Sequence, residues 1–331
     1  MDLTEVAPKD HWTTMRSLLT LADTHQLPDG SHPWESVWVY DHFHTVPTPS
    51  DQATHEAWTL MAAFAAATER VRLGQMCTCM AYREPTYLAK VAATVDAISG
   101  GRTEMGIGAG WYEHEWRAYG YGFPRAGERL AMLDEGVQIM AEMWRTGTSG
   151  RFEGKHYDVD GALCYPQPLQ TVRVDGVDVP SLPLWIAGGG ERKTLRTAAK
   201  YAQYTNFDGS LAGFAHKSAI LEQHCADVGR DFAEITRSSN YNVLIGTPAE
   251  QQEQLDWLEA VYRKHAPEQA DGQVASWAND SLRGTPEQIV EKLTALKAIG
   301  MTYAITYFPN SAENHAPINL FANEVIPALA S

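Results

Sequence analysis

Cysteine is scarce in this sequence. Only four cysteines occur among 331 residues, at Cys77, Cys79, Cys164 and Cys225. They are too few to predict a disulfide framework, and no second cluster of Cys or His completes a zinc-type pattern around Cys77 and Cys79. We therefore expect no metal site, and a reduced protein of the cytoplasm is the default prediction.

Long apolar runs and an excess of positive charge are also missing. The most apolar stretch extends only from Ala57 to Ala67, and acidic residues follow Met1 closely, so neither a membrane span nor a signal peptide is expected. Lys and Arg total 26 against 41 Asp and Glu, which gives a net charge of −15. Such a surface would repel a phosphate backbone, and general nucleic-acid binding is therefore not expected.

Apolar residues are plentiful, at 44% of the chain, and can fill a large core. Residues at three- and four-residue spacing predict helices, such as one that begins at Pro85 and stops at Gly100, and a last one that opens with Thr285 and Gln288 as a capping box. Between the helices, β-branched and aromatic runs predict seven strands, at residues 36–40, 70–77, 103–109, 183–187, 204–208, 240–245 and 302–308.

This alternation is typical of an open doubly wound sheet or a (β/α)8 barrel, and the even spacing of the strands along the chain favours the barrel. We expect one domain over residues 1–331. An eighth strand should come first, but residues 1–10 are acidic and contain Pro8, so the first strand is expected to be missing or irregular. Residues 145–182 and 265–284 break the alternation and are predicted to be insertions near the site.

Polar residues and glycines mark the ends of the first three predicted strands, where (β/α)8 enzymes place their sites. Asp41 and His42 could form an acid–base pair, or serve as a helix cap and a satisfied polar residue. Residues 76–78 bring a thiol and a hydroxyl to the next strand end. The alternating glycines of residues 106–110 suit either the close approach of a flat ring or tight packing, and match a dinucleotide-binding fingerprint only weakly.

A glycine turn follows the strand at residues 183–187. Gly188, Gly189 and Gly190 lead directly into a predicted helix, and Arg192, Lys193 and Arg196 follow them. Backbone N–H groups and the helix dipole favour a phosphate at such a place, and the three cations add local positive charge. The turn therefore predicts a phosphate site. The alternative is a flexible turn beside solvated charges.

Taken in order, these motifs resemble the bacterial luciferase-like flavin and deazaflavin oxidoreductases, and in particular their coenzyme F420-dependent subgroup. The resemblance covers about residues 36–308 and implies a (β/α)8 barrel whose strand ends carry a flavin or deazaflavin ring and whose glycine turn holds the phosphate. Six motifs carry it: residues 37–43, Thr78-x-x-x-Tyr82-Arg83-x-Pro85, Ser99-Gly100-Gly101-Arg102, residues 106–112 with Glu115, Phe152-Glu153-Gly154-Lys155, and residues 185–190.

The resemblance also implies roles for single residues. His42 is the implied catalytic residue, because histidine can exchange the proton that accompanies hydride transfer near neutral pH. A non-prolyl cis peptide bond is implied at Met76–Cys77, with Cys77–Thr78 as the alternative. The implied cofactor-binding residues are Asp41, His42, Met76, Cys77, Thr78, Ala109, Gly110, Trp111, Ala187, Gly188, Gly189, Gly190 and Arg192.

The function that follows from the resemblance is hydride transfer between F420 and a small organic substrate. An FMN-dependent monooxygenase and a non-catalytic ligand-binding barrel are the alternatives. The expected partners are a small-molecule substrate and, in a homodimer, a second copy of the chain, but neither nucleic acid nor a membrane. The polyglutamate tail of F420 would need cations at the pocket mouth, for which the candidates are Arg83, Lys155, Arg192, Lys193 and Arg196.

Overall fold

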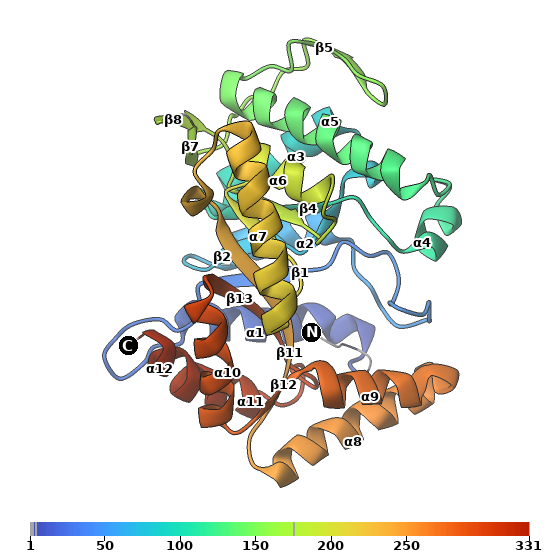
Figure 1. The fold of residues 1–331 in the computed structure, drawn as a ribbon. Coiled ribbons are helices and arrows are strands. Elements are labelled where there is room, and N and C mark those ends of the chain that lie inside the picture. Colours follow the sequence, from blue (N-terminus) through green and yellow to red (C-terminus); the bar gives the residue numbers. More distant parts are fainter. Residues whose placement is uncertain (1–2, 4, 175, 331) are drawn as a thin grey trace.

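A sheet of nine strands, all paired in parallel, forms the centre of the structure (Figure 1). The computed structural model describes residues 3, 5–174 and 176–330. All seven predicted strands are confirmed, and their carboxyl ends share one edge of the sheet. The strands are β1 (Ser36–Val39), β2 (Arg72–Gln75), β3 (Thr78–Cys79), β4 (Thr103–Gly108), β9 (Leu184–Ala187), β10 (Tyr204–Asn206), β11 (Thr236–Ile245), β12 (Leu282–Gly284) and β13 (Met301–Tyr307).

The sheet is a barrel with one open seam. Its order is β1-β2-β4-β9-β10-β11, and β13 also pairs with β11, but no strand within the described residues lies between β13 and β1. The expected irregular start is confirmed for residues 3 and 5–10, which form turns and the short helix η1 (Pro8–Asp10). Side chains bridge the seam: Ser36 Oγ lies 2.5 Å from the Tyr303 hydroxyl, and the rings of Tyr40 and Tyr307 stack with centroids 5.2 Å apart.

Helices cover the outside of the sheet, and their predicted start and stop signals are confirmed. Gly100 ends one helix with a φ of 70°, in the left-handed region that glycine adopts readily. Thr285 and Gln288 form the predicted capping box of another. The helices are α1 (His11–Thr24), α2 (Ala57–Ala67), α3 (Pro85–Ser99), α4 (Glu113–Ala118), α5 (Ala126–Thr146), α6 (Thr194–Tyr201), α7 (Leu211–Val228), α8 (Pro248–His265), α9 (Ala270–Asp280), α10 (Pro286–Ala298), α11 (Ala316–Leu320) and α12 (Ile326–Ala330). Within the described residues, no helix combines the length and apolarity that crossing a membrane requires.

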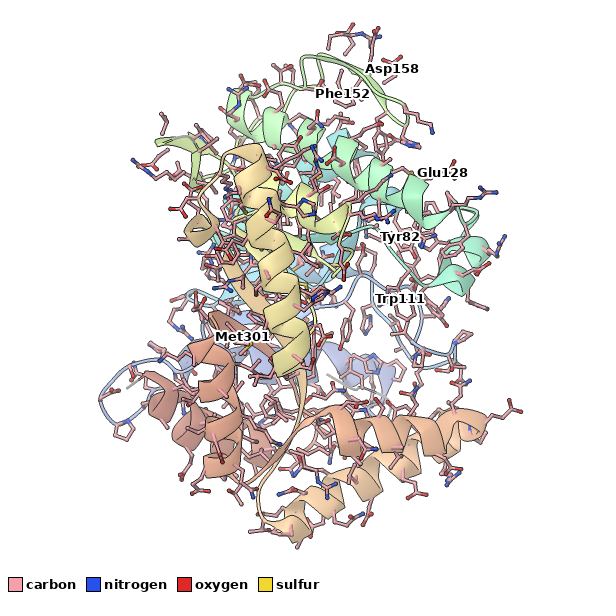
Figure 2. The ribbon with its side chains drawn as sticks, in the orientation of Figure 1. Tyr82, Trp111, Glu128, Phe152, Asp158 and Met301 are labelled. Carbon is pink, nitrogen blue, oxygen red and sulfur yellow. The ribbon has the colours of Figure 1, made fainter. Side chains whose placement is uncertain are left out.

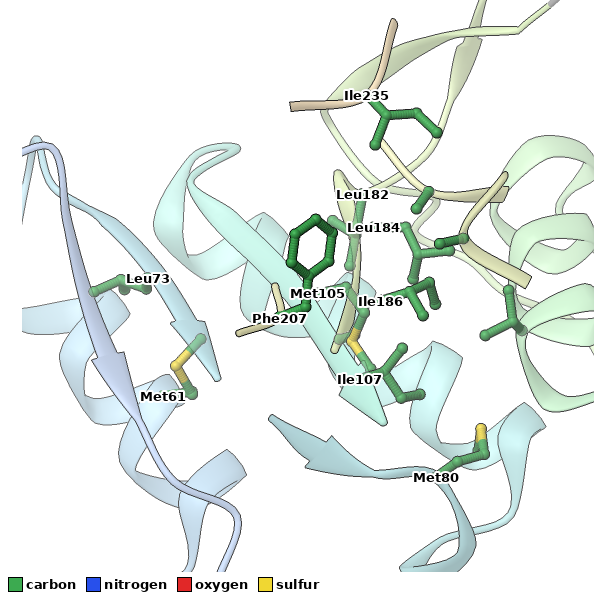
Figure 3. Close-up of a cluster of buried hydrophobic side chains, with 14 of the residues drawn as sticks. Met61, Leu73, Met80, Met105, Ile107, Leu182, Leu184, Ile186, Phe207 and Ile235 are labelled. Atoms are coloured by element: carbon green, nitrogen blue, oxygen red, sulfur yellow. The ribbon is translucent and has the colours of Figure 1, made fainter. Parts of the chain in front are cut away.

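Both faces of the sheet are packed, as expected for parallel strands. Between the sheet and its helices, Leu73, Met105 and Ile107 are completely buried in the main core, part of which is drawn in Figure 3. Inside the barrel, Trp185 stacks on Tyr204 with ring centroids 4.1 Å apart. The interior is thus filled with side chains, which leaves the strand ends as the place for a site.

The two predicted insertions lie in different parts of the fold. Residues 145–182 form two antiparallel hairpins, β5 (Arg151–Glu153) with β6 (Asp158–Asp160) and β7 (Thr171–Val174) with β8 (Val177–Pro180). The Gln170 side chain donates to the carbonyl of Thr103, at 2.7 Å, at the amino-terminal end of β4. This contact lies opposite the strand ends that carry the predicted site. Residues 265–284 contain α9 and the unpredicted strand β12.

Candidate active site at the carboxyl ends of the strands

His42 follows β1 and is paired with a buried carboxylate. Its Nδ1 lies 2.9 Å from Oε2 of Glu115, which α4 carries and which is completely buried. The hydroxyl of Tyr82 donates to the same oxygen at 3.0 Å, and the backbone N–H of Phe43 donates to Oε1. These bonds fix Glu115 against His42, so the ring has a defined orientation.

The electrostatics of Glu115 decide which nitrogen of His42 is available. Burial raises the pKa of Glu115, but hydrogen bonds from His42 and from the Phe43 N–H outweigh it, and the net pKa is lowered. Glu115 is therefore ionised at neutral pH and accepts a hydrogen bond from Nδ1 of His42. In a neutral imidazole whose Nδ1 carries the proton, Nε2 is the acceptor, and this nitrogen of His42 can then take a proton from a substrate.

Aromatic rings surround His42. Its ring centroid lies 6.1 Å from both Trp111 and Tyr112, and 6.2 Å from Tyr40. Trp111 is 60% exposed, whereas Tyr112 is buried. Tyr82 and Trp111 are marked in Figure 2. The histidine thus stands among flat apolar surfaces that suit an organic substrate or a planar cofactor.

Asp41 is engaged within the protein. It is 3% exposed and accepts two hydrogen bonds from the Arg83 guanidinium, at 2.7 and 2.9 Å, and one from the Cys79 N–H at 2.9 Å. Arg83 also donates to Glu56 at 2.7 Å. Asp41 and Arg83 therefore hold the end of β1 to the turn after β3. Arg83, a candidate for the cofactor tail, already has two carboxylate partners.

The predicted strand end at residues 76–78 contains a cis peptide bond at Met76–Cys77, which confirms the first of the two expected positions. Met76 is buried against Trp185 in the barrel interior, and the hydroxyl of Thr78 donates to Gln75 Oε1 at 2.7 Å. Cys77 is half-buried, and burial raises the pKa of its thiol to about 12, with Asp41 adding to the effect. Cys77 is thus a neutral, apolar surface at this edge.

The alternating glycines permit close packing of neighbouring strand ends. A Cβ added to Gly108 would lie 2.7 Å from Cys77 Sγ and 3.4 Å from the carbonyl oxygen of Ala187. Gly110, with a φ of 73°, would place a Cβ 2.5 Å from Cys79 Sγ. Cys77, Gly108 and Ala187 therefore form one continuous row across three strand ends, and no larger side chain fits at Gly108.

The glycine turn after β9 exposes unpaired donors. The N–H of Gly188 is bonded to the Asn206 carbonyl at 2.8 Å, and the carbonyl of Gly190 accepts from the Leu195 N–H at 3.1 Å. In the part of the chain that is described, the N–H groups of residues 189–192 have no hydrogen-bond partner. Because α6 begins just beyond them, they can receive an anion.

Basic side chains from the turn itself and from α7 lie around the glycines. Arg192 and Lys193 are exposed beside it. Lys217 and His216, both on α7, reach it from the other side and bind Glu191, at 2.6 and 3.0 Å. The sequence suggested the basic residues that follow the glycines but neither of the two on α7, because nothing in the α7 pattern shows that His216 and Lys217 face a turn some 25 positions earlier.

A cavity of about 700 Å³ adjoins the site on the side of the open seam. Tyr40, Tyr307 and Asn242 line it near the strand ends. Of the residues predicted to bind a cofactor, only His42 belongs to its lining. The structure therefore distributes the predicted residues among the His42 pair, the row of strand ends and the glycine turn, and the lining does not include Asp41, Met76, Cys77, Thr78, Ala109, Gly110, Trp111, Ala187, Gly188, Gly189, Gly190 or Arg192.

Sequence comparisons place this architecture among known proteins. The chain is 33% identical over 171 residues to F420-dependent glucose-6-phosphate dehydrogenase from Amycolatopsis mediterranei (strain U-32). The matched stretch covers 51% of this chain and 46% of the relative. Over 151 residues it is 36% identical to pyrimidine monooxygenase RutA from Bradyrhizobium sp. (strain BTAi1 / ATCC BAA-1182), which covers 45% and 38%. The chain thus spans less than half the length of either curated relative.

Solved structures share the fold over nearly the whole chain. An F420-dependent secondary alcohol dehydrogenase in complex with an F420–acetone adduct has a TM-score of 0.75 at 19% identity and covers 97% of this chain and 95% of its own. A type II Baeyer–Villiger monooxygenase from Pseudomonas putida in complex with FMN has a TM-score of 0.67 at 17% identity, with 97% and 94% covered. Residues 32–303 match the family model described as luciferase-like monooxygenase. The chain therefore belongs to the luciferase-like monooxygenase family.

Proposed function

We propose that this protein is an F420-dependent oxidoreductase that exchanges a hydride with a small organic substrate. The observation that carries the proposal is the His42–Glu115 pair at the strand ends, with Nδ1 bonded to a buried carboxylate at 2.9 Å and Nε2 available. The relative named as an F420-dependent glucose-6-phosphate dehydrogenase and the F420-bound structural neighbour support it.

The residues present fit the cofactor at both of its ends. The unpaired N–H groups of residues 189–192 and the cations Arg192, Lys193 and Lys217 suit its phosphate and acidic tail. The row formed by Cys77, Gly108 and Ala187 offers a flat, uncharged surface to its ring. When bound, F420 supplies a carbon centre that accepts or donates a hydride.

The chain's own contribution is the movement of the accompanying proton. In the direction of substrate oxidation, Nε2 of His42 accepts the hydroxyl proton of the substrate. Glu115, ionised at 2.9 Å from Nδ1, stabilises the resulting imidazolium charge. In the direction of reduction the same nitrogen returns the proton. Trp111 and Tyr112 lie edge-on beside the His42 ring, with centroids 6.1 Å away.

An FMN-dependent monooxygenase is the second candidate. It is favoured by the 36% identity to RutA and by the FMN-bound neighbour with a TM-score of 0.67. Fluorescence titration of the protein with F420 and with FMN tests the choice. Assays then follow F420H2 oxidation with a panel of aldehydes, ketones and enones, and oxygen consumption with reduced FMN. Tight FMN binding with oxygen consumption, and no F420 binding, would assign the protein to the monooxygenases.

Gly189→Asp should weaken binding of either cofactor by about tenfold or more. The change places a carboxylate where the unpaired N–H groups face an anion, so that repulsion replaces attraction. Gly272→Asp is the matched control, since Gly272 is exposed on α9 with no atom within 4 Å of an added Cβ. Equal affinities for the parent and Gly189→Asp would show that the phosphate binds elsewhere.

The affinity for F420 should fall as the salt concentration rises. Surface cations would hold its acidic tail, and dissolved ions screen that attraction over a Debye length of about 10 Å at 0.1 M salt. The double change of Arg192 and Lys193 to Ala should flatten this salt dependence. Lys9 and Arg16, which are also exposed, provide a double-Ala control with the same loss of charge. A salt slope that is unchanged by the first pair would exclude these two cations as tail contacts.

A further inference from the structure

Tyr82 is a buried partner of the His42–Glu115 pair. It is 6% exposed, and in the described part of the chain it is not among the residues that line the cavity. Its hydroxyl donates a hydrogen bond to Oε2 of Glu115 at 3.0 Å, and Nδ1 of His42 lies 2.9 Å from the same oxygen. One carboxylate oxygen is therefore shared between a histidine that lines the cavity and a tyrosine that does not.

The other partners of Glu115 belong to the backbone. The N–H groups of Phe43 and His44 donate to Oε1, the second at 3.3 Å. Among the described residues, no Lys or Arg forms an ion pair with this carboxylate. The charge of Glu115 is thus stabilised by a small set of hydrogen-bond donors and by His42, so each donor matters to how much charge remains for the histidine.

Aromatic packing fixes the direction of the Tyr82 hydroxyl. The ring stacks on Tyr121 with centroids 4.9 Å apart, and it packs against Phe43 at 4.8 Å and Trp116 at 5.4 Å. These contacts involve the ring rather than the hydroxyl, so a phenylalanine at this position would keep them. The effect of the hydroxyl can therefore be separated from the effect of packing.

The hydroxyl of Tyr82 stays protonated throughout the pH range in which histidine titrates. Burial raises the pKa of Tyr82 far above its usual value, and Cys79 and Glu115 add to the rise. A neutral hydroxyl has one proton to donate, and Glu115 accepts it. Tyr82 therefore acts on the site as a permanent donor, and only through Glu115.

A carboxylate that accepts an additional hydrogen bond attracts a neighbouring imidazolium less strongly. The Tyr82 donor stabilises negative charge on Oε2, the oxygen that His42 meets. Less of that charge is then available to stabilise the protonated His42 ring than in a carboxylate without this donor. The tyrosine thus favours release of the proton from His42.

Other titratable and charged groups surround the pair and stay the same when the Tyr82 hydroxyl is removed. Asp41 and Arg83 are bound to each other, and burial raises the pKa of the Cys79 thiol well above its usual value. The groups that face His42, Glu115 or Tyr82 from the neighbouring elements are Tyr40, Asp41, His44, Cys79, Arg83 and Tyr112.

We propose that Tyr82 is a positioning residue that, through Glu115, sets the acidity of His42 for the proton step. The proposal rests on the proposed function, in which His42 exchanges a proton with the substrate. Because Tyr82 shares Oε2 with His42, the protonated ring becomes a stronger acid and the neutral ring a weaker base. Such a balance suits a group that must both accept and return a proton near neutral pH.

Tyr82→Phe should raise the pH at which His42 is half-protonated by about 0.5 or more, because Glu115 loses a donor to its charged form. NMR of the cofactor-free protein with ¹⁵N-labelled histidine follows this titration, and His42→Ala identifies the signal. The pH profile of F420H2 oxidation should move to higher pH by the same amount. Tyr157→Phe is the matched control, since its hydroxyl is also buried but has no hydrogen-bond partner within the described residues.

Incorporation of 3-fluorotyrosine at position 82 should give the opposite result. It keeps the hydrogen bond to Glu115 with a more acidic and therefore stronger donor, so the midpoint of His42 should fall. This protein also provides the test if Tyr82→Phe does not fold. A His42 midpoint that neither change moves, or that Tyr157→Phe moves equally, would overturn the proposal. Midpoints that move as expected in a protein without turnover on F420 or FMN would support the role of Tyr82 and count against the proposed function alone.

Discussion

Turnover should fall by about 10²–10⁴-fold when His42 is replaced by Ala, the range usual for loss of a general acid–base group. Cofactor affinity should stay close to that of the parent, because the phosphate contacts proposed for the glycine turn are untouched. The measurements are F420H2 oxidation with the substrate panel and fluorescence titration of F420. His32→Ala is the control, because His32 is exposed and contacts Gln26 and the His25 carbonyl rather than the site. Turnover near the parent value in His42→Ala would assign the proton step to another group.

Glu115→Gln tests two roles of Glu115 separately: orienting the His42 ring, and stabilising the charge of the protonated ring. The amide oxygen can still accept the Nδ1 proton, but the negative charge that stabilises the imidazolium is lost. In the parent, the lowered pKa of Glu115 means that its support is present at neutral pH and is lost as the pH falls through that lowered value. The turnover of the parent should therefore fall as the pH is lowered. If the parent and Glu115→Gln lose turnover over the same acidic pH range, the titration of Glu115 does not cause that loss.

Asp41→Ala should lower the free energy of unfolding by about 3–5 kcal/mol. The change leaves the Arg83 guanidinium, whose side chain is 11% exposed, without its bidentate partner and the Cys79 N–H without an acceptor. Urea unfolding followed by circular dichroism measures the loss. Arg117→Ala breaks a pair with Glu113 in which both side chains are more than half exposed, and should cost less than about 1 kcal/mol.

The contact between Arg83 and Glu56 moderates this loss without removing it, because Glu56 lies at the surface and Asp41 is buried. If the two variants unfold within about 1 kcal/mol of each other, the buried pair does not hold this strand end. The comparison also bears on the site, since Asp41 immediately precedes His42. A folded but loosened Asp41 variant should therefore lose turnover as well as stability.

Local patterns predicted the regular elements of the fold because each signal lies within a few residues. Pro85 and Gly100 delimit α3 through backbone chemistry alone, and the Thr285 capping box starts α10. β12 escaped prediction because three residues are too short for a pattern, and it forms by pairing with residues 243–245 of β11. The first residues of β11 are polar, so they gave no apolar pattern from which a strand could be predicted. Ser238 is buried there because its hydroxyl donates a hydrogen bond to the Thr205 carbonyl on the neighbouring strand.

The candidate site was predictable only in part. His42 and the glycine turn follow strand ends, which the sequence locates directly. The partner of His42 lies 73 positions away on α4, and that of Asp41 lies 42 positions away, so tertiary packing rather than any local pattern brings each pair together. Glu115 did stand within one of the family motifs, which was the one signal for it.

The burial of the thiols determines how the protein can be handled chemically. All four cysteines are free, and burial raises the pKa of each, to about 12 for Cys77 and well above the usual value for Cys79. Thiolate is the species that alkylating reagents and peroxide attack, so the native chain should resist both near neutral pH. A single cysteine placed on an exposed helix would then be the only fast-reacting thiol, and a dye could be attached there without first removing the natural ones.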